Sequence, residues 1–166
     1  PKHYRLTVEA IEQDEEGTGE NREAFWQALA AALTGEIRRN TATLVFCNNR
    51  RTVEKLTRYI NDAAGEPLVY SHHGSLAREL RLAVEHKLKA GELKGIVATN
   101  PLELGIDIGD LDAVILVQTP PSLTAVIQRI GRAGHGVGQV SRGILFPIHG
   151  RDFLEAAVAS GSLPAA

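Results

Sequence analysis

Residues 95–109 read Gly95-Ile-Val-Ala-Thr-Asn-Pro-Leu-Glu-Leu-Gly-Ile-Asp-Ile-Gly109. The first residues form a short apolar run, which Asn100 and Pro101 then end. A short apolar run that is bounded by turn residues is typical of a strand in a parallel sheet. We therefore expect a strand from Gly95 to Thr99, followed by a loop of polar and glycine residues.

Similar apolar runs recur on both sides of this stretch and alternate with segments of helical periodicity. This alternation is typical of βαβ units, so it predicts an α/β fold with a mainly parallel central sheet flanked by helices. The other expected strands are Arg5–Ile11, Thr43–Cys47, Pro67–Ser71, Ala113–Gln118 and Gly143–Ile148. The expected helices carry apolar stripes at Trp26, Leu29, Leu33 and Ile37; Val53, Leu56 and Ile60; Leu76, Leu80, Val84 and Leu88; and Leu123, Val126, Ile127 and Ile130.

The composition predicts one compact domain over residues 1–166, with 43% hydrophobic and 23% charged residues. A last helix is expected near Arg151, and the small residues of 160–166 predict a linker or tail. No apolar run is long enough to span a bilayer and no signal peptide is apparent, so we expect a soluble, cytoplasmic, monomeric chain. The single cysteine, Cys47, excludes an internal disulfide and is expected to be buried at a strand end.

Polar and glycine residues follow three of the expected strands, where an open parallel sheet binds its ligands. They are Asn48, Asn49 and Arg50; His72, His73, Gly74 and Ser75; and the loop from Asn100 to Asp107. Net charge is only -2, which argues against a large basic binding surface. Any grip on nucleic acid must therefore be local.

A second group of candidate functional residues lies in the stretch Gln128-Arg-Ile-Gly-Arg-Ala-Gly-His135. Arg129 and Arg132 are three residues apart, so on a helix they share a face, while Ile127 and Ile130 provide an apolar base. Such a pair of planar guanidinium groups suits phosphate oxygens. The alternative is a solvated helix face.

Four motifs in this order resemble the second RecA-like domain of superfamily 2 helicases. They are Leu44-Val-Phe-Cys-Asn-Asn49, Ser71-His-His-Gly-Ser-Leu76, the stretch 97–109 and the stretch 128–135. The residues of these motifs are most similar to those of the large helicase-related (Lhr) group. The resemblance implies a three-layer RecA-like fold and the second motor domain of an ATP-dependent helicase or translocase.

The resemblance also implies roles for single residues in an ATP site. Arg132 is the stronger arginine-finger candidate, since its charge would stabilise the transferred phosphoryl group, and Arg129 and Gln128 line the same cleft. Asp107, with Gly105, would meet the ribose of ATP. His135 stands where many relatives carry a third arginine, so we expect it to contribute little or to stabilise a helix C-terminus instead.

Contacts to the phosphates of a tracked single strand of DNA or RNA are implied for the loops that follow the strands. Thr99 and Asn100 would contribute a hydroxyl and an amide, which position a strand without reading its bases. Gly74 and Ser75 would present main-chain N–H groups at the start of a helix at Leu76, where Ser75 is also an ordinary N-cap. Asn49 and Arg50 have the same two interpretations, with more weight on capping and solvation.

No Gly-x-x-x-x-Gly-Lys-Ser/Thr occurs in the chain. By resemblance, the Mg²⁺ of the Mg²⁺–ATP complex would be held by a first RecA-like domain, which would be the main partner and would complete the ATP site. Two alternatives stay open: a non-catalytic RecA-like module that binds nucleic acid or a protein, and a double-stranded-DNA translocase.

Two further signals do not fit their context. Gly134 to Gly138 has dinucleotide-loop spacing, but it follows a helix and precedes a strand, the reverse of the required order. His72 and His73 are adjacent and must face different ways, so a metal site is not expected, and we expect the pair to shape the loop instead.

Overall fold

The structure, a computed structural model, describes residues 3–8, 19–99, 111–117 and 140–145. In chain order these residues form β1 (His3–Val8), α1 (Gly19–Arg39), β2 (Thr43–Phe46), α2 (Arg50–Ala64), β3 (Val69–His72), α3 (Arg78–Lys89), β4 (Gly95–Ala98), β5 (Ala113–Leu116) and β6 (Val140–Leu145). The expected helix near Arg151 and the tail 160–166 lie outside the described residues. In the described part of the chain, no helix is long and apolar enough to cross a membrane.

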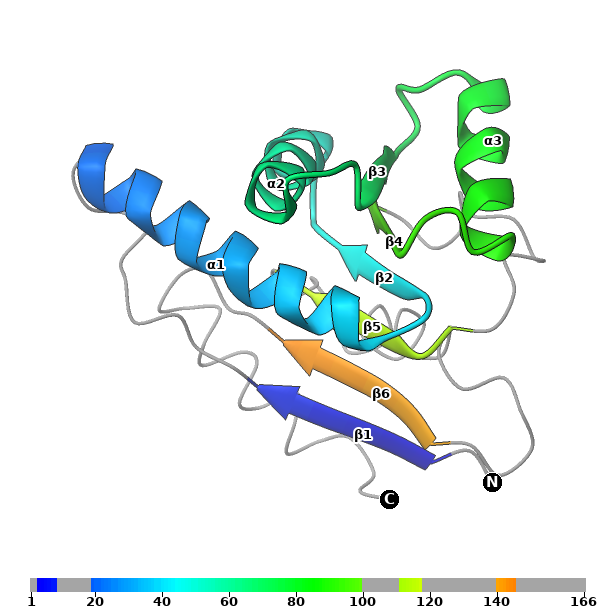
Figure 1. The fold of residues 1–166 in the computed structure, drawn as a ribbon, viewed down its shortest axis with the longest axis horizontal. Helices are drawn as coiled ribbons and strands as arrows, with labels where there is room; N and C mark the ends of the chain where they lie inside the picture. The colour runs from blue at the N-terminus through cyan, green and yellow to red at the C-terminus, as the bar shows by residue number, and fades with distance from the viewer. Residues whose placement is uncertain (1–2, 9–18, 100–110, 118–139, 146–166) are drawn as a thin grey trace.

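The described strands form one sheet in the order β1-β6-β5-β2-β4-β3, and every neighbouring pair is parallel (Figure 1). The register is level across the strands next to the polar loops: Phe46 pairs with Ala98, and Ala98 pairs with His72. The predicted α/β fold with a mainly parallel sheet is confirmed.

The sheet is covered on both faces, which gives the expected three layers. Alternate residues of each strand face opposite layers, as the period of two requires. One cluster joins α1 and α2 to Val45, Cys47, Val69, Val97, Ile115 and Val117. The opposite cluster joins α3, through Val84 and Leu88, to Leu44, Phe46, Ile96, Ala98, Val114 and Leu116. Each large apolar side chain removed from water in these layers contributes about 1.5–3 kcal/mol.

Three of the six described strands begin where they were predicted, whereas the other three strands and helix α3 do not. β2, β4 and β5 begin at the predicted residues, while β3 begins at Val69 rather than Pro67. β1 and β6 begin earlier than predicted, at His3 and Val140, which lie opposite one another in the sheet. The start of α3 was predicted at Leu76 and is at Arg78.

The prediction that Leu80 belongs to the core stripe of α3 is wrong, since this side chain is 56% exposed. The buried residues of α3 are Val84, Glu85 and Leu88, all in its C-terminal half. Helical spacing indicates which residues share a face, but only the packing of the helix on β3 and β4 decides how much of that face is covered.

Helices α1 and α2 lie next to one another (Figure 1), and aromatic side chains contribute to their contact. The Trp26 and Tyr59 ring centroids are 6.3 Å apart, and the Lys55 ammonium lies 4.3 Å from the Trp26 centroid. The Tyr59 hydroxyl donates to Glu23. This hydrogen bond, with smaller contributions from burial and from the carboxylate charge, raises the pKa of Tyr59 above its ordinary value.

Asn61 of α2 completes the outer side of strand β3. Its amide nitrogen donates to the Val69 carbonyl at 2.9 Å, and its amide oxygen accepts from the Val69 N–H at 3.0 Å. The side chain thereby replaces a neighbouring strand at an edge that would otherwise be unpaired. Helix α2 then ends at Gly65, whose φ of 72° is a left-handed conformation that suits glycine.

We predict that Asn61→Ala lowers the free energy of unfolding by about 2 kcal/mol, because it leaves a backbone N–H and C=O of β3 without partners. Urea unfolding monitored by circular dichroism measures this change. Asp62→Ala, at the exposed neighbouring position, is the matched control and should change stability by less than about 0.5 kcal/mol. Equal stability of the two variants would show that β3 does not depend on the Asn61 amide.

Candidate nucleic-acid interface

Three polar segments meet at the carboxyl edge of the sheet because their strands are neighbours with level ends. Strand β4 lies between β2 and β3, so Thr99, which follows Ala98, lies between the two flanking loops. On one side the chain passes through Cys47, Asn48 and Asn49 into α2, and on the other side through His73, Gly74 and Ser75 towards α3. Cys47 is buried, as predicted, and its N–H donates to the Ala98 carbonyl at 2.9 Å.

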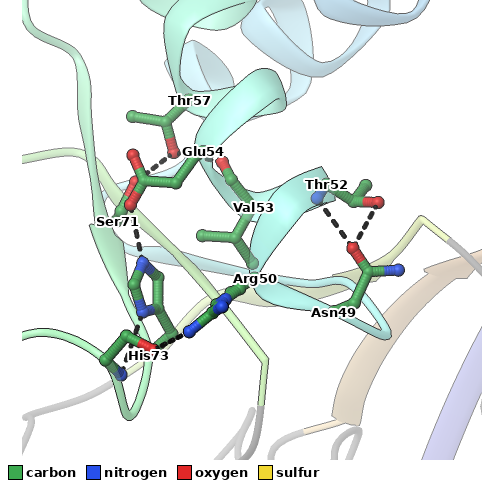
Figure 2. A network of polar contacts seen from close by, with 9 residues as sticks. Asn49, Arg50, Thr52, Val53, Glu54, Thr57, Ser71 and His73 are labelled. Atoms are coloured by element: carbon green, nitrogen blue, oxygen red, sulfur yellow. Dashed lines mark hydrogen bonds and ion pairs between the residues drawn. The ribbon is translucent and has the colours of Figure 1, made fainter.

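Asn49 is the N-cap of α2. Its backbone is extended, and its side-chain oxygen accepts from the Thr52 N–H at 2.9 Å and from the Thr52 hydroxyl at 3.0 Å (Figure 2). The cap satisfies one of the N–H groups that an α-helix leaves without partners in its first turn. The capping interpretation of Asn49 is therefore confirmed.

Arg50 connects the two loops across strand β4. Its Nη1 atom donates to the Ser75 hydroxyl oxygen at 2.5 Å, although 25 residues separate them in the chain. Both residues are exposed, so the contact lies at the surface of the edge. The predicted residues Arg50 and Ser75 are thus brought together, with Asn49 and Gly74 next to them in the chain.

The first turn of α2 is electropositive. It contains Arg50 and Arg51 and no acidic residue, and both guanidinium groups are exposed. Neither forms an ion pair with a carboxylate among the described residues. A helix N-terminus carries partial positive charge, so the charges of two arginines there are unfavourable unless a nearby anion offsets them. The position suits a phosphate group.

The interpretation of Ser75 as an N-cap is wrong. Helix α3 begins at Arg78, its N-cap is Ala77, and no side chain caps it. The Leu76 N–H donates instead to the His73 carbonyl at 3.1 Å, which closes a turn over residues 73–76. Gly74 and Ser75 are therefore exposed at the tip of this turn, with the Ser75 hydroxyl directed to Arg50.

The two adjacent histidines face opposite layers, as their spacing predicted. His72 Nε2 lies 3.0 Å from Glu85 of α3, and His73 Nε2 lies 2.6 Å from Glu54 of α2. Ser71, one residue earlier, donates to Thr57 of α2 at 2.8 Å (Figure 2). No group of three or more His, Cys, Asp or Glu side chains that could hold a metal ion occurs in the described ranges.

The remaining predicted site residues lie outside the described part of the chain. These are Asn100, Gly105, Asp107, Gln128, Arg129, Arg132 and His135. The structure also adds two residues that sequence reasoning missed. Glu54 was missed because an exposed glutamate on a helix gives no functional signal in the sequence. Arg51 was missed because the positive charge at this place was attributed to its neighbour Arg50 alone.

A parallel sheet covered by helices on both faces, with polar loops at its carboxyl edge, places the chain among the doubly wound α/β folds, to which RecA-like domains belong. The chain belongs to the family described as the helicase conserved C-terminal domain, whose profile matches residues 24–136. The predicted likeness to the Lhr group is confirmed by the relatives.

The structure of Mycobacterium smegmatis helicase Lhr bound to ssDNA and AMP-PNP superposes with a TM-score of 0.84 and 36% identity, covering 99% of this chain and 23% of that one. The Escherichia coli Lhr helicase/uracil glycosylase is 38% identical over 86% of this chain and 12% of its own length. The ATP-dependent helicase Lhr-Core protein 2 of Thermococcus barophilus is 41% identical over 80% of this chain and 16% of its own length. The chain thus spans less than a quarter of each of these relatives.

We predict that Asn49→Ala lowers the free energy of unfolding by about 1 kcal/mol, because the first turn of α2 loses its cap. Asn49→Asp keeps an oxygen at the same place and should lose only a few tenths of a kcal/mol. Thermal or urea unfolding of the two variants makes the comparison. If the two variants are equally destabilised, the loss comes from something other than the cap.

Proposed function

We propose that this chain is the second motor domain of an ATP-dependent nucleic-acid helicase or translocase. Family membership supports the helicase class. The proposed surface that binds the nucleic-acid strand, called the strand track below, rests on the contact between Arg50 and Ser75. This contact joins two loops beside Thr99 at one edge of the sheet. Its polar groups include a guanidinium and hydroxyls, which can bind the phosphates of a strand, whereas the Ser75 N–H already donates to His73. The M. smegmatis relative was solved with ssDNA, which favours a single strand as the ligand.

The second part of the proposal is half of an ATP site. Arg132 acts as the arginine finger, Arg129 and Gln128 line the cleft, Gly105 and Asp107 meet the ribose, and His135 makes at most a weak contact. A first RecA-like domain supplies the phosphate loop and holds Mg²⁺, so that closure of the two domains around ATP completes the site. Relatives with ATP-dependent helicase in their names support the use of ATP.

In the intact protein, Arg132→Ala should lower kcat for ATP hydrolysis by roughly 10³-fold, at the low end for arginine fingers, with a smaller change in ATP affinity. The control is Arg39→Ala, a surface arginine of α1 that pairs with Glu36. Steady-state kinetics with saturating single strand measures both variants. An unchanged kcat in Arg132→Ala would assign this arginine to a solvated helix face.

Asp107→Ala should affect the same reaction differently, because a ribose contact acts equally in the ground state and the transition state. It should raise KM for ATP with little change in kcat.

For the strand track, single-strand affinity should depend only weakly on salt through this domain, because among the described residues of the edge the basic side chains are Arg50 and Arg51 and the other donors are neutral. Arg50→Ala in the intact protein should weaken binding and reduce the slope of log K against log salt by about 0.7, the value for one phosphate contact on a single strand. Fluorescence anisotropy at several salt concentrations gives the slope, with Arg39→Ala as control. An unaltered slope and affinity would place the track elsewhere.

A further inference from the structure

His73 uses both of its ring nitrogens at the edge of the sheet. Its Nδ1 atom accepts from the Ser75 N–H at 3.2 Å, and its Nε2 atom lies 2.6 Å from the Glu54 Oε1 atom (Figure 2). The ring is 5% exposed. By contrast, the buried ring of His72 has no partner for Nδ1 in the described part of the chain. His73 therefore has a single ring orientation that satisfies both nitrogens.

These two contacts assign the tautomer of His73. A neutral imidazole has one donor and one acceptor nitrogen, and Nδ1 accepts a hydrogen bond from a backbone N–H. The hydrogen must then be on Nε2, which donates to the Glu54 carboxylate.

The effect of this arrangement falls on the strand-contacting turn. The His73 carbonyl accepts from the Leu76 N–H while its ring accepts from the Ser75 N–H, so one residue holds the turn from both its backbone and its side chain. Glu54 belongs to the same helix as Arg50, one turn further along. The same helix therefore holds the turn through His73 and contacts its tip at the Ser75 hydroxyl.

We propose that His73, oriented by Glu54, is a positioning residue that holds Gly74 and Ser75 in the conformation that binds a strand phosphate. The proposal rests on the proposed function of the turn. Glu54 has a side chain that is 56% exposed, so its contact with His73 adds little to stability. The Glu54 contact instead fixes the orientation of the imidazole, which in turn fixes the direction of the Ser75 N–H.

Three substitutions of His73 separate the two contacts. His73→Asn places its side-chain oxygen where Nδ1 stood, so it can still accept from the Ser75 N–H, as in an Asx-turn, but it cannot reach Glu54. His73→Gln can place its amide nitrogen near Nε2 and donate to Glu54, but it offers Ser75 no acceptor. His73→Ala loses both contacts. His86→Ala, an exposed histidine of α3, is the control.

Binding of a fluorescein-labelled single-stranded oligothymidine to the intact protein is measured by anisotropy, together with thermal unfolding of each variant. We expect His73→Ala and His73→Gln to bind about tenfold more weakly, the scale of one or two lost hydrogen bonds. His73→Asn should recover binding to within about threefold of the unmodified protein. A merely structural role would not give this rescue, because Asn and Gln both leave a cavity beneath the turn.

Glu54 gives a second test that leaves the buried ring in place. Glu54→Gln keeps an oxygen that can accept from Nε2, whereas Glu54→Ala removes it. Glu54→Ala should weaken binding by about threefold and Glu54→Gln by less. Equal binding by these two variants and by the unmodified protein, together with unchanged binding by His73→Ala, would overturn the positioning role.

The same titration separates this proposal from the proposed function of the turn. If Arg50→Ala weakens strand binding and every folded His73 variant binds normally, the positioning proposal fails and the strand track stands. If Arg50→Ala and Ser75→Ala both bind normally, the strand does not contact this turn, and both proposals fail. Loss of binding by His73→Asn in proportion to its loss of thermal stability would also overturn the positioning role.

Discussion

Burial of the central strands on both faces is the constraint on which the rest of the structure depends. Every residue of β2, β4 and β5 is buried, so helices must cover each face of the sheet. Helices α1 and α2 cover one face and α3 the other, so the central strands reach the surface only at their ends in the described part of the chain. Because all the described strands are parallel, their carboxyl ends lie at one edge, and the polar loops are gathered there.

This constraint also determines how the candidate interface is held. The level register of β2, β4 and β3 ends these strands at the same height, so the loops that contain Asn49, Thr99 and Gly74 begin next to one another at the edge. The alternation of side chains along β3 then sends His72 to one layer and His73 to the other, where each meets a glutamate on a helix. The turn that follows is thereby anchored next to both layers, although Gly74 and Ser75 at its tip are exposed.

The few charges described at this edge suit the positioning of a nucleic-acid strand better than its strong electrostatic attraction. The chain has a net charge of only -2, and the local positive charge comes from two arginines in the first turn of α2. Hydroxyl and main-chain donors hold phosphates without depending on a strong field, and they do not distinguish one base from another. The proposed strand-binding role would need contacts of this kind, because a strand that moves must be released as readily as it is bound.

The sequence alone was sufficient for the fold class, the family and the start of β2, β4 and β5, because an apolar run between turn residues is a local signal. It also indicated that Asn49 caps a helix and that His72 and His73 face different ways. Sequence could not show that Leu80 is exposed, that α3 begins at Arg78, or that Arg50 meets Ser75 and His73 meets Glu54. Those features depend on strand order and register, which bring together residues far apart in the chain, and only the tertiary structure decides them.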